Sequence, residues 1–194
     1  HGYAINLGGG YHHAKPTKGE GFCLFADVPI AIKVLQKEKK IKRALIIDTD
    51  VHQGNGTIVC LPKDPTTFTF SMHQSGIYPM PKEVGDLDIE LKSGTGDEAY
   101  LAKLKQQLPK LFKRSKPDIV FHVAGCDALR GDPLASLEMT PEGIAKRDKM
   151  IAEACAKHKV PYVMTLSGGY SKGAWRSQCK GIVEVMKVAA KSKK

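Results

Sequence analysis

An apolar segment that ends in two carboxylates and a histidine constrains this chain more than any other feature. Residues 44–48 are typical of a buried strand and end in Asp48. Asp50 and His52 follow before two glycines break the chain. In extended geometry alternate side chains point the same way, so the three polar groups could share one side. Asp and His are ordinary ligands of zinc and iron, although a strand ending in polar turn residues has the same pattern.

Apolar segments alternate with segments of helical periodicity along the rest of the chain. The expected strands are residues 3–7, 44–48, 66–72, 86–91, 119–124 and 162–166, and the expected helices are 24–37, 55–61, 96–112, 140–157 and 174–190. This alternation predicts an α/β fold, with a mainly parallel sheet flanked by helices, in a single domain that covers residues 1–194.

Some boundaries carry their own signals. Pro29 fits a helix only near its start, so the first regular helix is expected to begin around it. Thr140 suits an N-cap and Pro141 the first helical position. Residues 73–85 hold two prolines and two glycines and predict a loop of functional length. Residues 86–91 alternate apolar and polar and predict an edge strand.

Polar residues follow four of the expected strands. In a parallel sheet the carboxyl ends of the strands lie along one edge, where open α/β folds bind their ligands. Side chains far apart in the sequence are therefore expected to converge at this edge: Asp48, Asp50, Asp127, Tyr170 and the pair His12 and His13.

Three of these groups form a ligand set. Asp50, His52 and Asp127 would leave one metal position open for water or substrate, as catalytic metal sites do. A metal so held polarises a carbonyl and activates bound water. His12 and His13 would supply a general base and acid, and a tyrosine hydroxyl would stabilise a developing oxyanion. Each motif alone is also typical of an ordinary turn, but together they predict a metal-dependent hydrolase.

Composition indicates a globular protein from a reducing compartment. Hydrophobic residues make up 42% of the chain, and no apolar run approaches the length of a membrane span. No signal peptide is visible, and the chain opens without Met, as a fragment or a processed form would. The five cysteines include no CxxC pair, which argues against a disulfide framework. We expect an intracellular protein, in the cytoplasm or nucleus of a eukaryote or the cytoplasm of a bacterium, with no membrane partner.

The net charge of +10 comes mainly from lysine clusters such as residues 37–43 and 103–116. A basic surface can attract nucleic acid or an acidic partner. No aromatic residues interleave with these clusters in a way that suggests base stacking. Lysine-rich helix faces explain the charge better, and we expect no direct sequence-specific binding of nucleic acid.

Five motifs occur in order along the chain. They are Gly8-Gly9-Gly10-Tyr11-His12-His13, Gly21-Phe22-Cys23, IDTDVHQGNG at residues 47–56, Gly125-Cys126-Asp127 with Gly131-Asp132-Pro133, and Ser167-Gly168-Gly169-Tyr170. In this order they resemble the zinc-dependent histone deacetylase family of the arginase/deacetylase superfamily. The HQGNG form is most similar to the class IV branch and its bacterial relatives. The resemblance covers nearly the whole chain and implies an arginase/deacetylase-like fold.

The resemblance implies a role for each residue of the site. Asp50, His52 and Asp127 match the zinc ligands, although two carboxylates and an imidazole also accept iron(II). His13 matches the general base and His12 its electrostatic partner.

Further positions match by the same resemblance. Tyr170 matches the tyrosine that polarises the scissile carbonyl. Asp48 matches the carboxylate that orients His12 and borders a structural potassium site. Ser71 and Met72 fall where that site takes backbone or hydroxyl oxygens. The substrate tunnel is matched by Phe22, Tyr78, Gly10 and Gly168. For the two aromatic residues, packing in the core stays an open alternative.

Two departures from the family pattern matter. Asn55 stands where many deacetylases carry a second carboxylate that orients His13. An amide does not stabilise the cationic imidazole as a carboxylate would, so the His13 pKa is expected to be less raised, which suits a base. The sequence also matches only the C-terminal two-thirds of the family domain. An uncovered sheet edge and exposed apolar helix surface are therefore expected.

These observations predict a zinc amidohydrolase that removes acetyl or longer acyl groups from lysine side chains of histones or other proteins. Metal-activated water would attack, with His13 as the base and Tyr170 polarising the carbonyl. The expected partners are an acylated lysine of a protein or peptide and a chromatin-associated complex. Two alternatives remain open: a deacetylase of acetylpolyamines or other small amides, and a truncated, non-catalytic protein that binds acyl-lysine.

Overall fold

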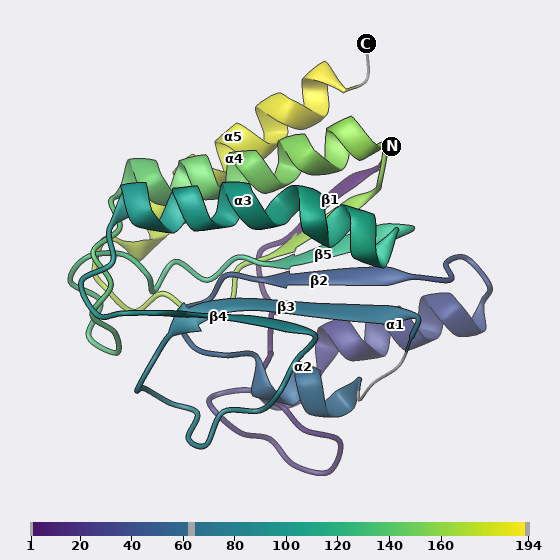
Figure 1. The fold of residues 1–194 in the computed structure, drawn as a ribbon, viewed down its shortest axis with the longest axis horizontal. Helices are drawn as coiled ribbons and strands as arrows, with labels where there is room; N and C mark the ends of the chain where they lie inside the picture. Colours follow the sequence, from purple (N-terminus) through teal and green to yellow (C-terminus); the bar gives the residue numbers. More distant parts are fainter. Residues whose placement is uncertain (1, 62–64, 193–194) are drawn as a thin grey trace.

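The computed structural model describes residues 2–61 and 65–192. Within these ranges six strands form one sheet with helices on both faces (Figure 1). The elements are β1 (Tyr3–Asn6), α1 (Asp27–Lys37), β2 (Ala44–Asp48), α2 (Asn55–Cys60), β3 (Thr67–Gln74), β4 (Leu87–Leu91), α3 (Asp97–Ser115), β5 (Ile119–Val123), α4 (Pro141–His158), β6 (Tyr162–Thr165) and α5 (Ala174–Lys191). Every strand pair is parallel, so the predicted fold class is confirmed.

The strand order β1-β6-β5-β2-β3-β4 brings the site segments together. The four strands whose carboxyl ends lead to candidate site residues are consecutive neighbours: β1, β6, β5 and β2. In this part of the sheet Asp48, the last residue of β2, lies level with Val123 of β5 and Ser71 of β3. The carboxyl ends of the strands lie to the left in Figure 1. β4 lies at one edge, as its alternating sequence predicted.

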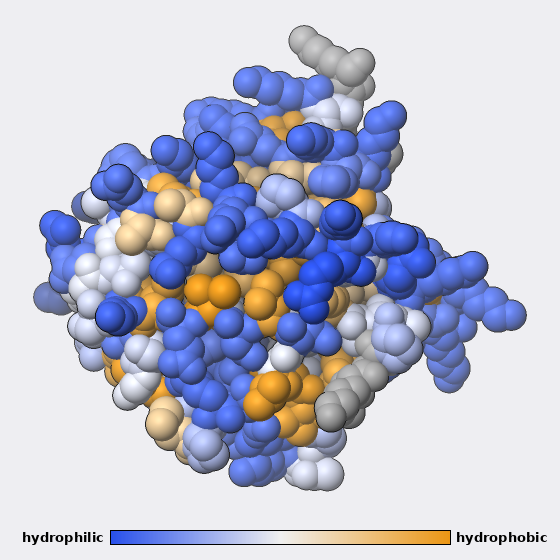
Figure 2. All heavy atoms as spheres, in the orientation of Figure 1, coloured by the Kyte–Doolittle hydropathy of each residue, from blue (hydrophilic) through white to orange (hydrophobic). Residues whose placement is uncertain are grey.

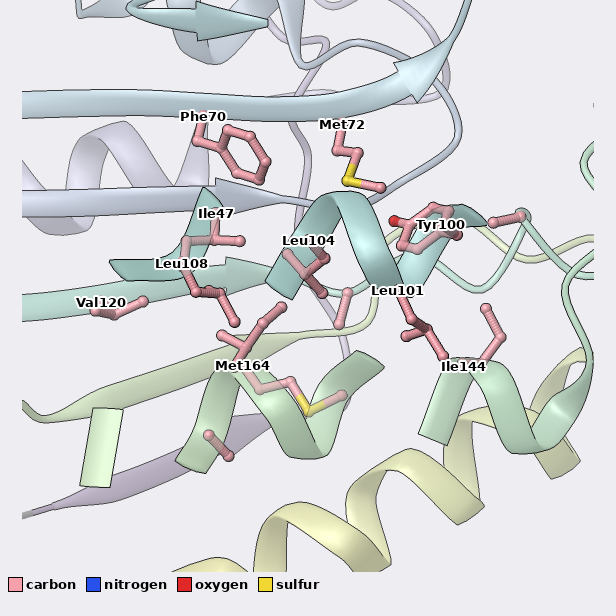
Figure 3. Packing of buried hydrophobic residues seen from close by; sticks show 14 of the residues in the cluster. Ile47, Phe70, Met72, Tyr100, Leu101, Leu104, Leu108, Val120, Ile144 and Met164 are labelled. Carbon is pink, nitrogen blue, oxygen red and sulfur yellow. The ribbon is translucent and has the colours of Figure 1, made fainter. Parts of the chain in front are cut away.

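Two helical layers bury β2 from both sides. Leu45 and Ile47 belong to the core under α3, α4 and α5, whereas Ala44 and Ile46 pack with α1. A strand covered on both faces needs apolar side chains at every position, which explains its unbroken apolar sequence. Figure 3 shows the larger core, in which Leu104 of α3 lies among the strand side chains.

Most expected boundaries lie within three residues of the observed ones, and the differences have physical causes. β3 continues to Gln74, so the predicted loop at 73–85 begins later. The N–H of Gln74 donates to the carbonyl of Val51, and Gln74 also pairs with Leu91 of β4, which extends the strand. α1 begins at Asp27 rather than at Pro29, because the first turn of a helix does not need the missing proline N–H.

Apolar side chains are exposed on and just before α1. Leu24, Phe25, Ile30 and Val34 lie open along one groove that is also lined by lysines. The expected exposed helix surface is therefore present. The face shown in Figure 2 is mostly hydrophilic, with hydrophobic atoms near the β4 edge and around α2. Among the described residues, no helix has the length and apolar character required to cross a membrane.

The polar side chain of His122 lies inside the core. His122, the last residue but one of β5, is fully buried, with its Nδ1 2.7 Å from the Tyr162 hydroxyl and its Nε2 2.8 Å from the Thr49 hydroxyl. Burial, and to a lesser degree the nearby charge of Arg147, hold the pKa of His122 well below its usual range. The folded protein therefore keeps His122 neutral.

Replacement of His122 should change how stability depends on pH. The unfolded chain binds a proton on His122 below about pH 6.5, whereas the folded chain does not, so stability falls as the pH decreases. At low pH this group contributes a slope that approaches about 1.4 kcal/mol per pH unit. The free energy of unfolding, measured with urea between about pH 5 and pH 8, should depend less steeply on pH in His122→Gln than in the wild type. Equal slopes would contradict a neutral buried His122.

Candidate metal centre and active site

The segment after β2 turns back on itself. Asp48 Oδ1 accepts a hydrogen bond from the N–H of Asp50 at 3.1 Å, and Asp50 Oδ1 accepts one from the N–H of His52 at 2.9 Å. Such bonds between an Asp side chain and the N–H two residues on are typical of turns. β2 ends at Asp48, so the expected extended geometry does not continue to His52. Asp48 accordingly faces His12 instead of sharing one side with the other two groups.

Asp50, His52 and Asp127 meet in one buried cluster whose ligand atoms all lie within 4.8 Å of one another. His52 Nδ1 is 3.1 Å from Asp50 Oδ1 and 3.2 Å from Asp127 Oδ2. Ligands of a tetrahedral zinc, each about 2.0–2.1 Å from the ion, stand roughly 3.3 Å apart. The observed separations therefore suit one shared cation.

The charge of the cluster also suits a cation. Asp50 and Asp127 are at most 1% exposed, and burial together with the charge of Asp50 raises the pKa of Asp127 well above its usual range. A divalent ion shared by both carboxylates would offset this repulsion, because it supplies the opposite charge where water cannot. The three residues fit the metal that the sequence predicted.

Gly168 lies directly against the metal ligands. Its N–H and the Ser167 hydroxyl each donate to Asp50 Oδ2 at 2.9 Å. A Cβ on Gly168 would lie 2.3 Å from Asp127 Oδ2, closer than real Cβ contacts. The close backbone approach expected for Gly168 is present, but it is made to the ligand carboxylates and not to the pocket described below.

Gly10 holds the loop after β1 against the same region. It has a φ of +82°, and its carbonyl accepts a hydrogen bond from the Ser167 hydroxyl at 3.0 Å. A Cβ on Gly10 would lie 2.9 Å from the Ser167 Cβ. Gly10 thus packs behind the ligands and does not line the pocket that it was expected to border.

The paired histidines have opposite electrostatic surroundings. His12 Nδ1 donates to Asp48 Oδ2 at 2.7 Å, and the two imidazole rings are 4.0 Å apart. Burial opposes a charge on His12, but the carboxylates of Asp48 and Asp50 outweigh it and raise the pKa of His12 to about 9. Burial and the charge of His12 lower the pKa of His13 to about 3. Pairs of titratable groups whose pKa values are pushed apart are typical of acid–base sites.

His13 is held by an amide. Its Nδ1 donates to Asn55 Oδ1 at 2.7 Å, and both residues are buried. The amide accepts the imidazole hydrogen without adding a negative charge beside it. Burial and the charge of His12 lower the pKa of His13, and the hydrogen bond with Asn55 offsets them only in part.

A pocket of about 330 Å³ opens beside this centre. It is lined by His13, Gly21, Phe22, His52, Tyr78, Leu134 and Tyr170. The Tyr78 ring lies edge-on to His13 at 4.8 Å. Phe22 is 81% exposed and 6.1 Å from the Tyr170 ring, so packing in the core does not account for it. The pocket therefore has aromatic walls, with an imidazole and a metal-ligand candidate among its lining residues.

The residues expected at a potassium site lie next to Asp48, on β3. Ser71 is opposite Asp48, and its hydroxyl is 2.8 Å from His73 Nδ1. The Met72 side chain points into the core (Figure 3). These positions do not show whether the oxygens of Ser71 and Met72 and the Asp48 carboxylate bind one ion. Potassium binding therefore stays a prediction.

Sequence reasoning missed two residues that support the site. Asp132 is buried, and its Oδ2 accepts hydrogen bonds from the N–H groups of Tyr170 and Ser171 at 2.8 and 3.2 Å. It fixes the loop that carries the tyrosine. Asp132 belongs to the fourth motif, but nothing in that motif indicates a contact with the backbone of Tyr170.

The other missed residue is Arg147 on α4. It is fully buried and donates to the carbonyls of Thr49 and Gly125 at 3.1 and 2.6 Å, just before the two ligand segments. The available signal was a charged pair, Arg147 and Asp148, at helical positions whose periodicity calls for apolar side chains.

Comparisons with known proteins agree with this geometry. A family model described as the histone deacetylase domain matches residues 1–186. An uncharacterized protein of Picosynechococcus sp. is 42% identical over 172 residues, which cover 89% of this chain and 57% of that protein. Histone deacetylase 2 of Arabidopsis thaliana is 39% identical over 178 residues, which cover 90% of this chain and 46% of that protein.

A solved structure shares the fold. The acetylpolyamine aminohydrolase from Burkholderia pseudomallei superposes with a TM-score of 0.82 at 21% identity, covering 96% of this chain and 57% of that one. The chain spans about half the length of the curated relatives it matches. Its family match over residues 1–186, its parallel sheet and its buried Asp-His-Asp cluster lead to one conclusion: the chain belongs to the histone deacetylase domain family.

Proposed function

We propose that this chain carries the catalytic centre of a metal-dependent amidohydrolase that removes acetyl or longer acyl groups from lysine side chains of proteins. The main support for this proposal is the buried cluster of Asp50, His52 and Asp127, which lies beside a pocket with aromatic walls. The pocket has a volume of about 330 Å³, and its aromatic and apolar lining would pack against the methylenes of an extended acyl-lysine side chain. Residues 1–194 would act as a single deacetylase-like catalytic domain.

The metal would be zinc, or iron(II), which the same ligands accept. When bound, it would polarise the amide carbonyl and lower the pKa of an attacking water. Asp50, His52 and Asp127 would hold it. We also propose that Asp48, with oxygens of Ser71 and Met72, borders a structural potassium ion.

The remaining residues would accept a proton from water, stabilise negative charge and donate a hydrogen bond to the substrate. His13 is neutral, and its Nδ1 is occupied by Asn55, so Nε2 is the atom that would accept a proton from water. His12, kept charged by Asp48, would stabilise the negative charge that develops nearby. Burial and the charges of Asp50 and Asp127 raise the pKa of Tyr170, which keeps its hydroxyl protonated. That hydroxyl would donate to the carbonyl oxygen.

Two alternatives predict different substrate profiles. The structural neighbour from Burkholderia pseudomallei is an acetylpolyamine aminohydrolase, so a small acylated amine is a second candidate substrate. A non-catalytic acyl-lysine binder is a third possibility. Assays of an acetyl-lysine peptide, a long-chain acyl-lysine peptide and an acetylpolyamine in parallel separate them. Hydrolysis of the acetylpolyamine alone would favour the second, and binding without hydrolysis the third. A chromatin-associated complex is the partner that the protein substrate would imply.

Loss of a metal ligand should weaken metal binding while the fold remains. The wild type should bind one zinc ion per chain. Asp127→Asn should raise the zinc dissociation constant at least about 100-fold. Replacing a residue that only hydrogen-bonds a metal ligand commonly weakens binding about 10- to 100-fold, and loss of the ligand itself should cost more. Competition with a chromogenic chelator measures the constant, and circular dichroism checks the fold. Glu153→Gln, which removes the same charge from an exposed position on α4, should bind zinc like the wild type. Equal affinity in Asp127→Asn would refute the ligand assignment.

Removal of the pocket hydroxyl should slow turnover without removing the metal. Tyr170→Phe should lower kcat about 10²- to 10³-fold, the usual effect of losing one oxyanion donor. His13→Ala should lower it about 10²- to 10⁴-fold, the range of a general base. Steady-state kinetics on the best substrate of the panel measures both. Tyr3→Phe loses a hydroxyl that contacts Ala152 far from the pocket and should leave kcat unchanged. Normal turnover by either site variant would exclude its proposed role.

A further inference from the structure

We propose that Glu20 is a positioning residue of the active site, which fixes the orientation of the Asn55 amide and through it the tautomer of His13. The proposal rests on the function above and adds a residue that the sequence motifs did not include. Glu20 lies in the loop between β1 and α1, one residue before Gly21.

Asn55 lies between a histidine and a carboxylate. Its Oδ1 is 2.7 Å from His13 Nδ1, and its Nδ2 is 3.0 Å from Glu20 Oε1. An ionised carboxylate can only accept hydrogen bonds, so the amide nitrogen must face Glu20. The amide oxygen must then face His13. Because an amide oxygen only accepts, His13 must carry its hydrogen on Nδ1 and keep its lone pair on Nε2.

The orientation of this amide depends on Glu20. The oxygen and nitrogen of an Asn side chain have nearly the same size, so packing alone does not distinguish the two orientations. If the amide turned over, its NH₂ group would face His13 Nδ1. The histidine would then accept at Nδ1 and carry its hydrogen on Nε2, the atom proposed to accept a proton. A carboxylate behind the amide therefore excludes the unproductive tautomer.

The same carboxylate oxygen also holds the pocket wall. The Tyr78 hydroxyl donates to Glu20 Oε1 at 2.9 Å, and the Tyr78 ring lies edge-on to His13 at 4.8 Å. One oxygen atom thus receives hydrogen bonds from the residue behind the base and from an aromatic wall beside it. Glu20 couples the position of the base to the shape of the pocket.

The surrounding loop keeps Glu20 in place and ionised. The backbone N–H and carbonyl of Glu20 exchange hydrogen bonds with those of Cys23 at 3.0 and 2.9 Å. Glu20 Oε2 lies 3.1 Å from Lys18 Nζ and 3.4 Å from Lys15 Nζ. Hydrogen bonds from Lys18 and Tyr78 lead the contacts that lower the pKa of Glu20 to about 2. The group is therefore an acceptor at neutral pH.

The turn around Glu20 leaves little room for other arrangements. Gly21 has a φ of +54°, and a Cβ there would lie 2.5 Å from His13 Cδ2. The next residue, Phe22, also has a positive φ, of 64°, and reaches the pocket. The loop that presents Glu20 to Asn55 is thus packed directly against the base.

Glu20→Gln tests the proposal on the intact, zinc-loaded chain. Glutamine has the same shape, but it can present either an oxygen or an NH₂ group to Asn55, so it no longer dictates the orientation of the amide. Long-range ¹H–¹⁵N NMR of the His13 ring should show one Nδ1–H tautomer in the wild type and a mixture in the variant. The kcat should fall about 10- to 100-fold, by analogy with the loss of a partner that orients a metal-binding histidine. Zinc affinity should be unchanged.

Two further variants complete the test. Glu20→Gln combined with Asn55→Asp places a carboxylate directly on His13 and should restore both the Nδ1–H tautomer and most of the lost kcat. Glu38→Gln removes the same charge from an exposed ion pair with Lys40 and should change neither readout. Recovery in the double variant also shows that Glu20→Gln acts through His13 rather than by unfolding the loop.

The outcomes separate this proposal from the proposed function. An unchanged His13 tautomer in Glu20→Gln would overturn the positioning role, whatever the kinetics. A changed tautomer in a protein that hydrolyses no member of the acyl-amide panel would support the positioning role and count against the proposed function. A kcat loss that Asn55→Asp does not restore, with the Nδ1–H tautomer intact, would also overturn it.

Discussion

Two buried carboxylates that lie side by side, Asp50 and Asp127, determine what the surrounding structure must provide. Buried like charges repel, so each needs nearby donors. The N–H of Val51 donates to Asp127, and Ser167 and Gly168 donate to Asp50. These groups follow β2, β5 and β6, which are neighbours in the sheet. The cluster therefore forms only where the fold aligns the ends of these three strands, and a bound cation would complete its charge balance.

The helical layer over the sheet contributes to the same balance. Arg147 is fully buried, is paired with Asp148 at 2.8 Å, and bonds the carbonyls of Thr49 and Gly125 beneath the two ligand loops. Breaking such a pair leaves an uncompensated buried charge, which is strongly destabilising. The loops that carry Asp50 and Asp127 are thus held by Arg147 from the helical layer as well as by their neighbours along the sheet edge. Loss of this buried pair would therefore disturb both the stability of the fold and the geometry of the site.

Local patterns in the sequence sufficed for the fold class and for the candidates that follow strands. A short unbroken apolar run such as that of β2 is typical of a strand covered on both faces, and parallel strands bring their ends to one edge. Contacts between loops produce no such pattern in the sequence. Glu20 is a single acidic residue in a lysine-rich loop, and its partner Asn55 is 35 positions away. Asp132 likewise acts on the backbone of Tyr170, and a side chain that binds backbone atoms requires no particular residue type there.

The alternation along β2 has a consequence for how this protein can vary. Leu45 and Ile47 face one helical layer, Ala44 and Ile46 face the other, and Asp48 ends the strand against His12. Because side chains change face at every residue, losing or gaining one residue inside β2 would exchange the two faces and turn the terminal carboxylate away from the imidazole. Insertions and deletions are therefore expected in the loops and not in β2. The length of this strand sets the position of Asp48 relative to the hydrophobic core.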